Sequence, residues 1–115
     1  MEIAVEEADG GVTVIRLRGR MDTKGAADID TRFSLASGRK KAVMVDLTEV
    51  DFLASMGLRV LLTGARTVKA NGGKLDIYTH EGDVAKVLAA AGIDTLIPMF
   101  HDRNAALAAI MPQPE

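Results

Sequence analysis

A serine at the expected start of a helix is the residue of this chain best placed to do chemistry. Ser55 follows an apolar strand pattern at residues 42–46 and a short apolar connector, and an amphipathic helical pattern begins directly after it. We expect Ser55 to be the N-cap of that helix, where free backbone N–H groups and the positive end of the helix dipole converge. The same features favour a phosphate group. The sequence thus leaves two roles open for Ser55, a helix cap and a phosphorylated switch.

The residues after Ser55 indicate a contact surface. Gly57 falls at the expected second helical position, where glycine costs roughly 1 kcal/mol relative to alanine. We interpret this glycine as a sign that another group closely approaches the start of the helix. Met56 is expected to be exposed, and its flexible side chain suits a surface that adapts to a partner.

Catalysis by this serine has weaker support. The pentapeptide LASMG lacks the first glycine of a hydrolase nucleophile elbow. Only His80 and His101 could act as its general base, and both are interpreted as ordinary surface or capping histidines. Asp22, Asp46 and Asp51 could gather at one loop edge, but three scattered carboxylates fix no metal-ligand geometry, so we expect turn and capping roles. A small enzyme that uses Ser55 or the aspartates remains a hypothesis, beside the cap and the switch.

The amino-acid composition limits the classes of fold and function that this chain can have. The chain has 115 residues, 48% of them hydrophobic and 26% charged, which indicates one globular domain with its own core. Aromatic residues make up only 3%, so the core must be mainly aliphatic. The net charge of −2 provides no basic surplus for direct binding of nucleic acid. The absence of cysteine excludes disulfides and thiolate chemistry.

The sequence also predicts a cytoplasmic protein. The acidic residues near the N-terminus are unlike a signal peptide. No apolar run approaches the roughly 20 residues that a membrane-spanning helix needs, so no membrane insertion is expected.

Hydrophobic patterns in the first half predict the elements that lead to Ser55. Residues 2–7 and 12–18 alternate as strands around an Asp9-Gly10 turn, and Gly19 is expected to end the second strand. Thr23 is expected to cap a helix that ends at Gly38. Residues 42–47 are almost continuously apolar, as in a central strand buried on both faces.

The second half alternates helices with strands. The helix after Ser55 is expected to stop at Asn71-Gly72-Gly73 and to bury one stripe, formed by Leu58, Leu61, Leu62, Ala65 and Val68. Next we expect a strand at residues 74–78 and a helix that ends at Gly92. The chain then continues with a short edge strand within residues 93–100, with Pro98 near its end, and with a last helix capped by Asp102. A response-regulator receiver, in which Asp46 would end a central strand, is set aside because the chain opens with a hairpin. The order predicts an α/β domain with a mixed, mostly parallel sheet, an N-terminal antiparallel hairpin and about four helices.

Several short motifs resemble those of the STAS domain family, the sulphate transporter and anti-sigma factor antagonist domains. The segments DLT, VDF and SMGL, followed by VLL, lie in order between residues 46 and 62, and GRMD at residues 19–22 resembles the family's glycine-x-leucine-aspartate signature. The element order fits along essentially the whole chain, and the length suits a free-standing bacterial member. On this resemblance we expect residues 1–111 to form one STAS domain and residues 112–115 to be a disordered tail.

The resemblance implies a binding protein without enzymatic activity, an anti-sigma factor antagonist. Such a protein, while unphosphorylated, binds an anti-sigma factor that is also a serine kinase, and so releases the sigma factor. The kinase, which carries the ATP and magnesium, phosphorylates the serine at the helix start and ends the interaction, and a serine phosphatase resets it. By position this serine is Ser55. The antagonist itself, a monomer or weak dimer, is expected to need no cofactor or metal.

The partner-binding surface implied by the resemblance comprises Met21, Asp22, Thr48, Asp51, Met56, Gly57 and Arg59. Asp22 matches the family aspartate near the switch loop. The usual family pattern is Asp-Ser-Ser/Thr-Gly-Leu, whereas here Ala54 replaces the aspartate and Met56 replaces the second hydroxyl residue. Loss of the acid removes repulsion against a phosphate. The alternative function is a constitutive interaction subunit of a stress-sensing or lipid-transport complex, with Ser55 only as a helix cap.

Overall fold

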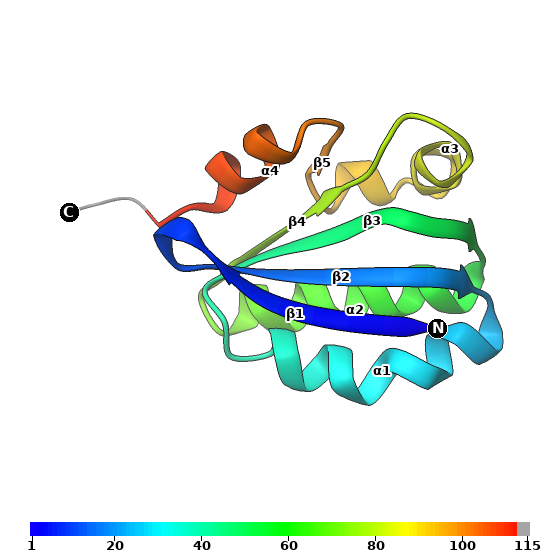
Figure 1. Ribbon diagram of the computed structural model, residues 1–115, viewed down its shortest axis with the longest axis horizontal. Coiled ribbons are helices and arrows are strands. Elements are labelled where there is room, and N and C mark those ends of the chain that lie inside the picture. Colours follow the sequence, from blue (N-terminus) through cyan, green and yellow to red (C-terminus); the bar gives the residue numbers. More distant parts are fainter. Residues whose placement is uncertain (113–115) are drawn as a thin grey trace.

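A five-stranded sheet organises the computed structural model, which describes residues 1–112 (Figure 1). The strands, in their order across the sheet, are β1 (Glu2–Ala8), β2 (Val12–Met21), β3 (Ala42–Leu53), β4 (Lys74–Tyr78) and β5 (Met99–Phe100). The β1–β2 pair is antiparallel, and the other neighbouring pairs are parallel. The predicted α/β fold with a mixed sheet is therefore confirmed.

The helices of the described residues are α1 (Thr23–Ser37), α2 (Ser55–Ala70), α3 (Asp83–Ala90) and α4 (Arg103–Ile110), with short 3-10 turns η1 (Asp9–Gly11) and η2 (Ile93–Thr95). Figure 1 shows α1 and α2 side by side below the sheet and α4 above it. Across residues 1–112, each helix is too short or too polar to cross a bilayer. Residues 113–115 of the predicted tail lie outside the described residues.

Two hydrophobic clusters hold these layers together. The larger one packs the sheet against α1, α2 and α3 and contains Ile15, Leu17, Phe33, Leu61, Ile77 and Leu88, among others. The smaller one lies under α4 and is formed by Val12, Val14, Ala42, Met44, Ala106 and Ile110. Alternate residues of β2 and β3 thus face opposite clusters, as the period of two in a strand requires.

β2 and β3 are both longer than the sequence predicts. Gly19 does not end β2: it adopts a φ of +116°, the register with β3 shifts after it, and the strand continues to Met21. A glycine at a bulge accepts a backbone conformation that other residues rarely adopt. β3 does not stop at residue 46 or 47, because its pairing with this longer β2 continues as far as the Met21–Leu53 pair.

The far half of β3 extends beyond its neighbour β4. Pairing between the two strands runs from Ala42–Lys74 to Asp46–Tyr78, and α3 packs against β3. Pro98 precedes the edge strand β5, rather than lying near its end, and its carbonyl accepts a hydrogen bond from Ile77 N–H at 2.9 Å.

Candidate functional site

The carboxyl ends of β2 and β3 lie side by side, and each strand leads directly into a helix (Figure 1). Met21 pairs with Leu53, and the N–H of Ala54 donates a hydrogen bond to the Met21 carbonyl at 3.1 Å. The first turns of α1 and α2 consequently meet at one edge of the sheet. We call this region, around Asp22 and Ser55, the switch edge.

Ser55 is the exposed first residue of α2, and it is not the N-cap that the sequence predicts. The N-cap is Ala54, whose carbonyl accepts the Leu58 N–H at 3.1 Å and whose methyl side chain can accept no hydrogen bond. The difference of one residue arises because β3 continues to Leu53 and leaves only Ala54 as a connector. The N–H groups of the first turn of α2 therefore have no capping side chain. Ser55 does not stabilise the helix as its N-cap.

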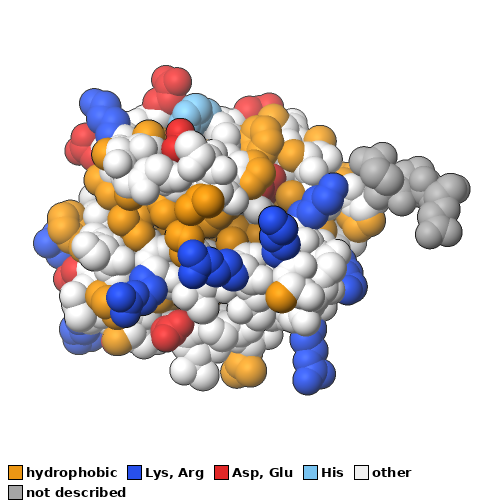
Figure 2. Space-filling view, turned by 180° about the vertical axis from the view of Figure 1, so that it is seen from behind, with side chains coloured by type: hydrophobic (Ala, Val, Ile, Leu, Met, Phe, Trp, Pro, Cys, Tyr) orange, Lys and Arg blue, Asp and Glu red, His pale blue; other side chains and the backbone are white. Residues whose placement is uncertain are grey.

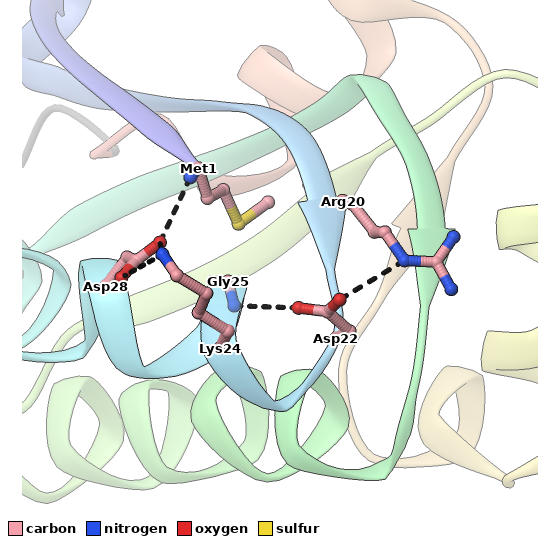
Figure 3. Close-up of polar contacts among 6 residues, drawn as sticks. All are labelled: Met1, Arg20, Asp22, Lys24, Gly25 and Asp28. Carbon is pink, nitrogen blue, oxygen red and sulfur yellow. Dashed lines mark hydrogen bonds and ion pairs between the residues drawn. The ribbon is translucent and has the colours of Figure 1, made fainter.

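Asp22 caps the neighbouring helix α1, so the predicted capping role of Thr23 is wrong. One Asp22 carboxylate oxygen accepts the Gly25 N–H at 2.8 Å, and the other lies 3.2 Å from Arg20 Nε (Figure 3). Thr23 is the first residue of α1. The hydrogen bond from Gly25 and the guanidinium of Arg20 hold the pKa of Asp22 below its ordinary value.

Met21 and Gly57, both predicted to contact a partner, are buried. Gly57 is the third helical residue, not the second, and a Cβ there would lie 2.7 Å from Leu53 Cδ1 and 2.8 Å from Met21 Cγ. The group that closely approaches the helix start is thus the end of β2 and β3. Both residues are thus packed inside the protein, beneath the first turn of α2, and their contact with a partner stays a prediction.

Two exposed hydrophobic residues lie close to Ser55 in the sequence. Phe52 and Met56 are 38% and 37% exposed, and the Arg20 guanidinium lies over the Phe52 ring, 3.8 Å from its centroid. Arg20 and Phe52 are register partners on β2 and β3. The sequence analysis did not predict the contact between Arg20 and Phe52, because it ended both β2 and β3 before these residues. Continuing the alternation of the two strands past Gly19 would have revealed the pair.

The other predicted contact residues lie on β3, at Thr48 and Asp51, and on α2, at Arg59. Thr48 and Asp51 line a cavity of about 210 Å³ between β3 and the segment from Thr79 to Val84. The Thr48 amide and hydroxyl donate to one Asp46 carboxylate oxygen at 2.9 and 2.7 Å, so its side chain is engaged internally. Arg59, one turn along α2 from Ser55, is exposed and makes no ion pair among the described residues.

The residues considered for catalysis or metal binding are engaged elsewhere. Asp46 is buried, with a carboxylate oxygen 3.7 Å from Arg16 Nε. His101 Nδ1 lies 2.8 Å from the Thr79 carbonyl, and the His80 ring packs edge-on against Tyr78. Within residues 1–112, no three His, Asp or Glu side chains are grouped so that they could hold a metal ion.

Because α2 lacks a capping side chain, Ala54→Asp should raise the free energy of unfolding by about 1 kcal/mol. Urea denaturation measures the change. The matched control is Ala70→Asp at the exposed last residue of the same helix, where the charge opposes the helix dipole and should lower stability by roughly 0.5 kcal/mol. Shifts of the same sign in both variants would contradict the assignment of Ala54 as the N-cap.

Comparisons with known proteins agree with this architecture. BtrV of Bordetella bronchiseptica, a proposed anti-sigma factor antagonist, is 26% identical over 110 residues, which cover 95% of this chain and 94% of BtrV. An anti-sigma factor antagonist from Mycobacterium paratuberculosis superposes with a TM-score of 0.87 at 23% identity, covering 96% of this chain and 94% of that chain. The Bacillus cell fate determinant SpoIIAA in its phosphorylated form gives 0.68 at 20% identity, covering 94% and 99%. The STAS domain profile matches residues 3–106, and the chain belongs to the STAS domain family.

Proposed function

We propose that this chain is a cytoplasmic anti-sigma factor antagonist that Ser55 phosphorylation switches off. In its unphosphorylated form it binds an anti-sigma factor that is also a serine kinase, and a serine phosphatase reverses the modification. The observation that carries the proposal is the position of Ser55, exposed at the start of a helix whose first turn has no capping side chain. The relatives named anti-sigma factor antagonists support it.

The helix start tolerates a phosphate on Ser55 for electrostatic reasons. A phosphate adds a charge of about −1.5 to −2 and three acceptor oxygens, which the free N–H groups and the helix dipole favour. Thr23 provides a contrast on the same edge, because it also begins a helix but the Asp22 carboxylate already occupies the first turn. The fold should therefore stay intact when Ser55 is modified.

The same phosphate opposes binding of a partner at the switch edge. Met56, the residue after Ser55, exposes apolar surface, and such surface must be desolvated in an interface. A dianion on Ser55, beside this surface, adds bulk and a desolvation cost. A loss of roughly 3 kcal/mol would weaken binding about a hundredfold.

Phosphosite mapping tests the proposal. Protein isolated under several growth conditions from the cells that make it should carry a condition-dependent phosphate on Ser55, seen by intact-mass and fragment spectrometry. Ser55→Ala should lose the phosphate and stay bound to its partner in the condition that releases the wild type. Thr23→Ala should behave as the wild type.

The constitutive-subunit alternative predicts a different outcome. Ser55 would then stay unmodified in every condition, and Ser55→Ala would change neither binding nor its regulation. An unmodified Ser55 throughout would count against the proposed switch.

A further inference from the structure

An apolar groove lies between α2 and the segment that leads into β5, away from the switch edge. Its larger part has a volume of about 490 Å³ and an apolar lining of Ala65, Leu75, Leu96, Pro98, Ala109 and Ile110. A second part of about 210 Å³ continues along α2 past Leu62 and Ile97. Leu96 is 64% exposed on its border. Figure 2 shows a hydrophobic band across this face of the molecule, with Lys and Arg side chains in a row beside it.

The charges around the groove are all of one sign. Its described lining includes Arg66, Lys69 and Lys74 and no acidic residue, although the chain as a whole has a net charge of −2. Nor does α2 contain an acidic residue anywhere along its length. None of these three cations forms an ion pair among the described residues. The groove thus lacks the negative charges that would complement its rim.

We propose that this groove binds an acidic amphipathic helix of a partner protein. The apolar face of the helix would lie in the groove, and its flanking carboxylates would pair with Arg66, Lys69 and Lys74. From Leu62 to Lys69 the groove follows α2 for about 10 Å, which matches about two turns of a docked helix. The site is separate from Ser55 and does not depend on the switch proposed there.

Two other occupants fit the groove less well. An added β-strand would need an edge strand to pair with, but β5 has only two residues and follows Pro98, which has no N–H to donate. A single-chain anionic lipid would use one cation at one end of a closed cavity, whereas three cations are spread along this groove.

A peptide library distinguishes the helix from these occupants. The library displays 15-residue helices with fixed leucines at i, i+3, i+4 and i+7 and with Glu, Gln or Lys at the flanking positions, selected against the full chain. Glutamate should be enriched at the flanks. For a selected peptide, Lys69→Glu and Leu96→Asp should each weaken the Kd by about tenfold or more.

The matched control is Lys86→Glu, an exposed lysine of α3 outside the groove, which should change the Kd less than about twofold. Unchanged amide spectra away from each substitution show that the variants are folded. The proposal is overturned if no member binds, if the flanks show no preference for glutamate, or if Lys86→Glu weakens binding as much as Lys69→Glu. Binding of phosphatidylglycerol vesicles that is abolished by Leu96→Asp would overturn it in favour of a membrane.

Discussion

Asp76→Asn should make the protein more stable by about 4 kcal/mol near pH 8 and by less than about 1 kcal/mol near pH 4. Asp76 lies on β4 beside Met44, on the sheet face that α4 covers, and it is fully buried. Neither of its carboxylate oxygens has a hydrogen-bond partner among the described residues. A buried, unpaired carboxylate is costly when ionised, and asparagine keeps the shape without the charge.

The direction of the pH dependence follows from the pKa of Asp76, which burial raises from 3.8 to about 7. Well below pH 3.8 this carboxyl is protonated in both the folded and the unfolded chain. As the pH rises towards 7, the unfolded chain ionises first, so the free energy of unfolding falls by up to about 4 kcal/mol. Well above pH 7 both states are ionised and the loss through this group is complete.

Urea denaturation of the wild type and Asp76→Asn from about pH 4 to pH 8 measures this effect. The difference between the two proteins isolates Asp76, because every other titrating group is common to both. Asp30→Asn, at an exposed position of α1 that makes no ion pair within residues 1–112, is the control and should follow the wild type. A stability difference that does not change with pH would show that Asp76 is not the group responsible.

The sequence was sufficient for the order of the elements and for the mixed sheet, because local signals determine both. Strand alternation, helical periodicity and the glycines after helices predicted the five strands and the four α-helices in their observed order. The ends of β2 and β3 were not predicted correctly, because pairing between the two strands determines where they end. Gly19 forms a bulge within β2 instead of ending the strand. That error moved the expected cap of α2 from Ala54 to Ser55 and hid the Arg20–Phe52 pair.

Burial at the site could not be predicted from spacing alone. Met21 and Gly57 carry the family pattern, but the packing of two strand ends beneath α2 places both inside. Asp76 occupies an alternate position of a strand, which normally faces water when polar. Only the return of α4 over that face makes it buried. These features depend on contacts between distant segments.

Gly25→Ala should lower the free energy of unfolding by about 3 kcal/mol, even though alanine favours helices. Gly25 is the third residue of α1, and a Cβ there would lie 2.0 Å from the Arg20 carbonyl oxygen and 3.3 Å from an Asp22 carboxylate oxygen. Because the obstacle is backbone, α1 must move away from β2. Urea denaturation measures the loss, with Ser34→Ala at an exposed position of α1 as a control expected within about 0.5 kcal/mol of the wild type.

The effect of Gly25→Ala should reach Ser55, because two glycines contact the same strand end. Gly25 packs on the Arg20 carbonyl, and a Cβ at Gly57 would lie 3.1 Å from the Met21 carbonyl oxygen. The Met21 carbonyl also accepts the Ala54 N–H at the start of α2. A displaced Arg20–Met21 segment must therefore shift the first turn of α2. Amide resonances of Ser55 and Met56 should move in Gly25→Ala and stay in place in Ser34→Ala; if they stay in place in both, the two helix starts are not mechanically coupled through β2.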